Sequence, residues 1–189
     1  MTHPAANVDS GIYLRPLVEA DIDERYVGWF ADAEVTRFLE ARGIGRDDAL
    51  AHLREGRESG RWHMYAICRS ADDLHIGNLK IGPIHPRHRT SDLITVMGER
   101  EAWGKGFARA AIRLGIGVAF AEHGIRKLSA SIDSLNVSSL RAYTAAGFEV
   151  EAVLKDQFFE SVDGTPVPSD KVFVACFNPS FAPTSEAAE

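Results

Sequence analysis

Apolar residues recur along this chain with two periods, one typical of strands and one typical of helices. Short β-branched and apolar runs alternate with turn-forming residues over much of the chain, whereas Phe107, Ile112, Leu114 and Val118 follow a helical spacing. The predicted strands cover 12–17, 63–68, 75–84, 93–97, 127–132, 148–154 and 170–177. Helices are predicted to begin at 20–24 and to cover 33–39, 46–58, 104–123 and 137–146.

The order of these elements predicts a mixed α/β (α+β) fold. Helices come first, three strands with short connections then suit an antiparallel meander, and strands afterwards alternate with helices. A length of 189 residues suits one domain with a substantial core. We therefore expect a single domain over residues 1–189, with flexible stretches at about 1–10 and 179–189.

Composition and charge argue against several classes of protein. Hydrophobic residues make up 45% of the chain and charged residues 25%, as in ordinary globular proteins. The net charge of −6 argues against non-specific nucleic-acid binding. No apolar run approaches the roughly 20 residues of a membrane span, and the start of the chain lacks a signal-peptide pattern. We therefore expect a cytoplasmic protein that binds neither nucleic acid nor membrane.

The sequence predicts no metal site. Its two cysteines, Cys68 and Cys176, lie far apart in separate apolar runs, without the clustered Cys and His spacing of a zinc site. Both cysteines are expected to be buried, reduced thiols.

The stretch 96–108 combines the end of a strand, a glycine-containing turn and the start of a long helix. N–H groups at a helix start lack intrahelical partners, and the helix dipole favours anions there. Gly104 and Gly106 carry no side chains that would keep a phosphate from the backbone, and Lys105 adds a positive charge. The spacing matches neither a P-loop nor a Rossmann fingerprint, whose third glycine is replaced by Arg109. The physical interpretation is a pyrophosphate site.

A second segment, 136–148, follows the predicted strand 127–132. Together the two segments resemble the GNAT N-acetyltransferases, which carry Gln/Arg-x-x-Gly-x-Gly/Ala and, further on, Asn-(x)6-Tyr-(x)3-Gly-Phe. The runs at 103–107 and 13–17 are similar to the branch with ribosomal-protein alanine N-acetyltransferases and related small-amine acetyltransferases. The resemblance spans residues 12–177. The matching positions are Gly104, Gly106, Ala108, Asn136, Tyr143, Gly147 and Phe148, whereas Glu101 replaces the usual Gln or Arg.

The resemblance implies a GNAT fold, which is a mostly antiparallel sheet of about seven strands flanked by helices, with two neighbouring strands splayed apart. Acetyl-CoA is the implied cofactor, and its pantetheine arm would lie between 92–98 and 127–132. The backbone of 97–99 would hold this arm and polarise the acetyl carbonyl, and the N–H groups of 100–108 would hold the pyrophosphate. The implied cofactor-binding residues are Met97, Gly98, Glu99, Gly104, Lys105, Gly106, Phe107, Ala108, Asn136, Ser139 and Tyr143.

In this family a neutral amine attacks the thioester directly, so an oxyanion forms and the leaving thiolate must gain a proton. The resemblance assigns Tyr143 as the catalytic acid beside the sulfur, while Asn136 is also suited to cap a helix. The general base stays open, because Ser131 stands where some members have a glutamate. The alternatives are a water chain and the ionisable residues Asp133, Glu99, His63, His85 and His88.

The sequence leaves three interpretations of the acceptor. The first is a small-molecule amine, such as an amino sugar or a nucleotide-linked amino sugar, with Trp29, Phe30 and His85 as substrate-binding candidates. The second is a protein N-terminus, as in the ribosomal-protein branch. The third is a non-catalytic acyl-CoA-binding regulatory domain, against which the presence of Tyr143 counts. A homodimer is one arrangement that the sequence leaves open.

Overall fold

A computed structural model describes residues 10–40, 42–162 and 164–182 of the chain. The expectation of flexible ends at 1–10 and 179–189 therefore falls largely outside the described residues. The strands are β1 (Ile12–Pro16), β2 (His63–Arg69), β3 (His75–Ile81), β4 (Thr90–Met97), β5 (Lys127–Asp133), β6 (Glu149–Val162) and β7 (Thr165–Phe177). The α-helices are α1 (Glu24–Ala31), α2 (Ala33–Thr36), α3 (Arg46–Ser59), α4 (Phe107–Ala121) and α5 (Val137–Ala146). Short 3₁₀ helices cover η2 (Glu19–Asp21) and η3 (Arg100–Ala102).

The seven strands form one sheet in the order β1-β2-β3-β4-β5-β7-β6. Neighbouring strands are antiparallel except β4 and β5, which are parallel. The parallel register joins only Thr90, Ser91 and Asp92 of β4 to Lys127, Leu128 and Ser129 of β5. Beyond Asp92 both strands continue without pairing to each other. The mostly antiparallel sheet with one splayed pair is confirmed.

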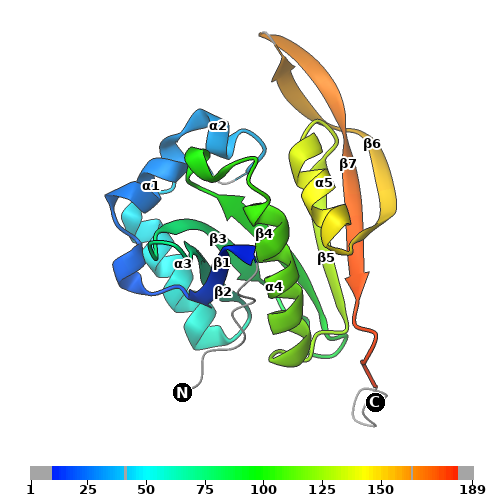
Figure 1. Ribbon diagram of the computed structural model, residues 1–189. Coiled ribbons are helices and arrows are strands. Elements are labelled where there is room, and N and C mark those ends of the chain that lie inside the picture. Colours follow the sequence, from blue (N-terminus) through cyan, green and yellow to red (C-terminus); the bar gives the residue numbers. More distant parts are fainter. Residues whose placement is uncertain (1–9, 41, 163, 183–189) are drawn as a thin grey trace.

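Helices α4 and α5 cover one face of the sheet (Figure 1). A Cβ on Gly115 of α4 would lie 2.5 Å from the side chain of Leu79 and 3.0 Å from that of Leu93, so this glycine lets the helix backbone approach the sheet closely. Helices α1 and α3 pack on the opposite face over β2, where Ala66 and Cys68 join their apolar cluster. The helices on this second face cover much less of β4, β5 and β7, where Asp92, Ile94 and Ser131 are exposed.

Local signals explain where most of the elements begin and end. Asp23 caps α1 by accepting a hydrogen bond from the N–H of Tyr26, so the helix starts later than the acidic run at 20–24 predicts. Gly60 and Gly147 end α3 and α5 with left-handed φ angles of 64° and 115°. Helix α2 is shorter than the predicted 33–39, and α4 starts at Phe107 because Gly104 and Gly106 are not helical.

The last two strands are longer than the sequence predicts. The predicted 148–154 and 170–177 extend to β6 and β7, which pair as far as Val162 and Thr165. Figure 1 shows this hairpin reaching past the first turn of α5. The polar and proline-containing residues at its tip carry little strand signal, and the pairing arises from the partner strand instead.

Candidate functional site

The glycine turn after β4 leads directly into α4. Gly104 and Gly106 have φ angles of 73° and 80°, and an added Cβ would meet no atom within 4 Å at either position. The space beside the turn is therefore open, while the backbone conformation favours glycine. Gly106 is the N-cap of α4 and offers no capping side chain, so the first N–H groups of the helix remain available to an anion. The side chain of Lys105 is exposed beside them.

Two tryptophans hold the backbone between β4 and this turn. The indole N–H of Trp103 donates to the carbonyl of Met97 at 2.9 Å, and that of Trp29 donates to Glu99 Oε1 at 3.0 Å. A Cβ on Gly98 would lie 2.0 Å from the Trp29 ring, so only glycine fits there. The N–H of Glu99 also donates to the carbonyl of Ile76. The Met97 carbonyl and the Glu99 N–H, both in the segment predicted to hold pantetheine, thus already have partners within the protein.

Tyr143 lies where β4 and β5 separate. Its side chain is 4% exposed, and its hydroxyl donates to the carbonyl of Leu93 at 2.8 Å. Leu93 directly follows Asp92, the last β4 residue that pairs with β5. Burial raises the pKa of the Tyr143 phenol to about 12, so it stays protonated at neutral pH. The hydroxyl of Thr95, two residues along β4, is buried and has no hydrogen-bond partner among the described residues.

The second predicted motif lies at the same edge of the sheet as the glycine turn. Because β4 and β5 are parallel, the loops after both strands emerge on the same side. Asn136 caps α5, and its side-chain oxygen accepts a hydrogen bond from the Ser139 N–H at 3.2 Å. The guanidinium of Arg113 in α4 donates to the carbonyl of Ala145 in α5. The structure therefore brings the predicted cofactor residues together on both sides of the splay.

Of the three predicted substrate residues, two are buried and the third lies at the far end of β4. Trp29 and Phe30 are only 5% and 8% exposed, because the apolar side of α1 packs into the core with Tyr26. At these exposures neither side chain offers a surface to an acceptor. His85 stacks on His88 and pairs with Thr90 at the start of β4, whereas the glycine turn follows its end. That separation is on the order of 20 Å along the strand.

The ionisable residues considered as general base mostly have partners. Asp133 is buried and accepts hydrogen bonds from the Ser169 hydroxyl and the Leu135 N–H, both at 2.8 Å. Glu99 is held by Trp29. His63 stacks on His123 with ring centroids 4.0 Å apart. These contacts fix the positions of Asp133, Glu99 and His63 within the protein.

The structure reveals an uncovered part of the sheet that the sequence analysis missed. We call it the open face; it lies opposite α4 and α5, over β4, β5 and β7. The register places Asp92 level with Ser129, and Ser131 level with Phe173. Asp92 and Ser131 are exposed, and Ile94 is 40% exposed although it lies inside a strand. The residues that define the open face are Asp92, Ile94, Ser131, Lys171 and Phe173.

The alternation of buried and exposed residues along β4 indicates this face. In the run Ser91 to Thr95, Leu93 points into the core and Asp92 and Ile94 point away from it. A charged residue at an outward position usually indicates only a solvated face, so Asp92 did not stand out. Its importance depends on the neighbouring strands, which sequence spacing does not give.

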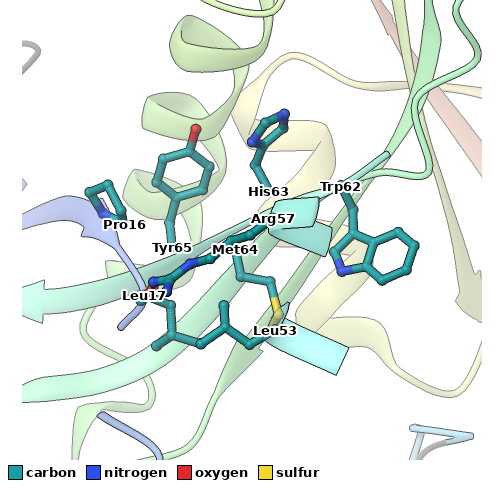
Figure 2. Close-up of a pocket in the computed structure, with 8 residues that line it drawn as sticks. All are labelled: Pro16, Leu17, Leu53, Arg57, Trp62, His63, Met64 and Tyr65. Carbon is teal, nitrogen blue, oxygen red and sulfur yellow. The ribbon is translucent and has the colours of Figure 1, made fainter. Parts of the chain in front are cut away.

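A cavity of about 120 Å³ lies apart from the splay, between β1, β2 and α3. Figure 2 shows His63 and Tyr65 projecting to one side of β2 and Met64 to the other. The Tyr65 hydroxyl is hydrogen bonded to His123 at 2.8 Å, and burial lowers the pKa of His123 to about 4. The cavity is lined by Pro16, Leu17, Leu53, Arg57, Trp62, His63, Met64 and Tyr65, none of which belongs to the predicted cofactor set.

Comparison with protein families gives a match to the acetyltransferase (GNAT) domain over residues 12–149. The chain is 25% identical over 178 residues to the probable N-acetyltransferase YjcK of Bacillus subtilis, covering 89% of this chain and 94% of that one. None of the helices in the described residues combines the length and the apolar character that a membrane span requires.

Two solved structures share the fold. The spermidine N-acetyltransferase of Vibrio cholerae, in complex with CoA and spermine, superposes with a TM-score of 0.79 at 17% identity. The alignment covers 91% of this chain and 98% of that one. The ribosomal-protein-S5-alanine acetyltransferase of Vibrio fischeri gives a TM-score of 0.76 at 16% identity, covering 92% and 96%. At these identities the likeness supports the fold and leaves the acceptor undecided.

Proposed function

Since the chain belongs to the GNAT family and is an acetyl-CoA-dependent N-acetyltransferase, we propose that it acetylates a primary amine of a small molecule by direct attack. The observation that carries this proposal is the end of β4–β5 pairing at Asp92, beside the Tyr143 hydroxyl. A thioester placed in the splay would meet a proton donor on one side and an uncovered sheet face on the other. No covalent enzyme intermediate is needed.

The cofactor arm would run along the edge of β4 that β5 leaves unpaired after Asp92. Amide groups of an extended pantetheine can pair with such an edge as an added strand does. The pyrophosphate would then meet the N–H groups at the start of α4, where Gly104 and Gly106 leave room for it. Lys105 would contribute charge, and Asn136 and Ser139 would flank the arm from the α5 side.

The amine would attack the acetyl carbonyl, and the C–S bond would break as the tetrahedral intermediate collapses. Tyr143 would donate its proton to the leaving thiolate. Its hydroxyl donates to the Leu93 carbonyl, so it must turn from this carbonyl toward the sulfur to act as the acid. A phenol with a pKa of about 12 is fully protonated at pH 7, as this role requires.

The charges on and beside the open face favour an acceptor that carries an anionic group besides its amine. Lys171 lies on this face with its ammonium 5.4 Å from the ring of Phe173, and Lys80 of β3 lies beside β4. With two lysines against the single carboxylate of Asp92, this face offers little attraction to a polycation such as spermidine. A nucleotide-linked amino sugar offers an amine for acetylation and phosphates for the lysines.

A protein N-terminus is the second candidate acceptor. The open face is uncovered at β4 and β5, where Asp92, Ile94 and Ser131 are exposed, and an extended peptide fits such a surface better than an enclosed pocket. Peptide α-amino groups have a pKa near ~8, so they need less help from a base than a lysine-like amine with a pKa near ~10.4.

The proposal is tested by acetyl-CoA turnover, followed as release of free thiol, against a panel of amines. The panel holds amino sugars, their nucleotide conjugates, spermidine, aminoglycosides and short peptides with free N-termini. We expect turnover with nucleotide-linked amino sugars and little with spermidine. Turnover confined to peptides would select the second candidate, and turnover of spermidine alone would contradict the charge argument. Acetyl-CoA binding, measured as a rise in melting temperature, shows that the protein is intact.

A further inference from the structure

The splay of β4 and β5 places Asp92 and Tyr143 on opposite sides of the same short stretch of backbone. Asp92 is the last β4 residue paired with β5, and the carbonyl of the next residue, Leu93, accepts the Tyr143 hydroxyl. Leu93 faces the core under α4, so the alternation of the strand turns Asp92 to the open face. Resting on the proposed function, we infer that Asp92 takes the proton from the acceptor amine and is thus a catalytic base.

The carboxylate of Asp92 differs from those of Asp133 and Glu99 in its hydrogen bonding. Among the described residues it accepts no hydrogen bond, and no Lys or Arg nitrogen lies within 4.0 Å of it. Asp133 and Glu99 are both hydrogen bonded within the protein, as described above. An exposed carboxylate without a partner, beside the place where the thioester must lie, can receive an ammonium group directly.

Two lysines that lie beyond ion-pair distance influence the pKa of Asp92. Partial loss of hydration raises the pKa of the Asp92 carboxyl, while Lys80 of β3 and Lys171 of β7 lower it. His52, on α3, lies behind Lys80 at 3.5 Å and is the further titratable group on that side. Burial lowers the pKa of the Lys80 ammonium. Because the loss of hydration outweighs both lysines, the pKa of the Asp92 carboxyl is raised, which makes it a better proton acceptor than a fully hydrated aspartate.

The step balances without any further reactant. The acceptor arrives as an ammonium, and Asp92 removes one proton to leave a neutral amine. The nitrogen lone pair forms the C–N bond while the carbonyl π electrons move to oxygen. When the C–S bond breaks, the thiolate takes the Tyr143 proton, and the phenolate recovers a proton from the acetylated nitrogen. The proton on Asp92 passes to solvent through the open face, so the products are the amide, CoA thiol and one released proton.

The experiment compares wild type, Asp92→Asn, Asp92→Glu and the control Asp47→Asn in the amine panel, from pH 6 to 10.5. Asp47 is an exposed aspartate in the first turn of α3. We expect Asp92→Asn to lower kcat about 100-fold at pH 7, within the usual range for a general base. The loss should shrink as pH rises past the pKa of the amine, because the amine then arrives neutral. Asp92→Glu should recover part of the rate, and Asp47→Asn should match wild type.

The outcomes separate this inference from the proposed function. If wild type turns over an amine and Asp92→Asn has an unchanged kcat and pH profile, the base is not Asp92 and the proposed function stands. A higher KM with unchanged kcat would also overturn the inference, since it would show an ion pair that only holds the ammonium. If wild type acetylates no amine although acetyl-CoA raises its melting temperature, the proposed function and this inference fall together.

Discussion

The two halves of the sheet differ in how many of their faces are covered. Strands β2 and β3 lie between helices on both faces, and six of the seven residues of β3 are buried. Strands β5, β7 and β6 have helix α5 on one face, and their other side includes the open face. On β6, at the sheet edge, Val150 is 54% exposed and Leu154 45%. Asp92 and Tyr143 lie at the boundary, where the half covered on both faces meets the half covered on one.

This difference shows how a single strand can hold one catalytic group in place and leave another accessible to the acceptor. Leu93 packs into the core from β4, and its carbonyl accepts the hydrogen bond that positions the Tyr143 hydroxyl. The other side of the same strand carries Asp92 on the open face. Positioning and access are thus separated by the alternation of one strand rather than assigned to different domains.

The largest effect is expected from removing the hydroxyl at the boundary. Tyr143→Phe keeps the ring and its contact with Phe148, whose centroid lies 5.1 Å away, but removes the proton donor. We expect kcat to fall by about 100-fold or more at neutral pH. Loss of the hydrogen bond to the Leu93 carbonyl should also cost about 1–2 kcal/mol of stability. Thiol release and thermal unfolding measure the two effects, and an unchanged kcat would remove Tyr143 from the acid role.

A strong effect on stability is expected from a substitution at Gly98, next to the half of the sheet that is covered on both faces. Gly98→Ala would place a methyl group 2.0 Å from the Trp29 ring, which is itself held by Glu99 and by the edge of His75. We expect a loss of about 3 kcal/mol in the free energy of unfolding, measured by urea titration. Gly28→Ala is the matched control, since nothing lies within 4 Å of its added Cβ. Because alanine favours a helix, the control should not lose stability, and an equally small effect of Gly98→Ala would show that Trp29 moves freely.

A smaller effect is expected from a substitution in the glycine turn, and it should appear in the affinity for acetyl-CoA. Gly106→Ala puts a side chain at a φ of 80°, which costs about 1–2 kcal/mol unless the turn rearranges. If the turn relaxes in the free protein, binding must restore its conformation, so we expect acetyl-CoA to bind roughly tenfold more weakly, since 1.4 kcal/mol corresponds to one factor of ten. Calorimetric titration measures this. Gly117→Ala, exposed inside α4, should leave the affinity unchanged; equal affinities for all three proteins would exclude the turn from cofactor binding.

The smallest effect is expected in the pH dependence of stability, through His123, which stacks on His63. The pKa of His123 is about 4 in the folded protein and near ~6.5 when unfolded, so the unfolded state binds the proton first. Stability is therefore complete above pH 6.5, and falls as the pH drops from about 6.5 to 4. Allowing for partial solvent exposure, we expect a loss of roughly 1–2 kcal/mol. Urea titrations should show a flatter profile for His123→Gln, and identical profiles would contradict this assignment.

Local sequence signals determined most of the elements and the cofactor half of the candidate site. Gly104 and Gly106 predicted an open turn before a helix, because their required conformations are local and favour glycine. Asn136 and Gly147 predicted the two ends of α5 by the same kind of local chemistry. These signals act over a few residues, so they can be read without knowing which segments meet.

Contacts between distant segments were decided only by the tertiary structure. Trp29 was predicted to bind substrate, yet it is buried against Gly98, 69 positions away. The position of Asp92 at the end of β4–β5 pairing, next to the Leu93 carbonyl that accepts the Tyr143 hydroxyl, follows from the strand register. Which faces of the sheet the helices cover depends on packing among all the elements. The sequence therefore predicts where acetyl-CoA can bind, whereas the side from which an amine can approach follows from the way the helices cover the sheet.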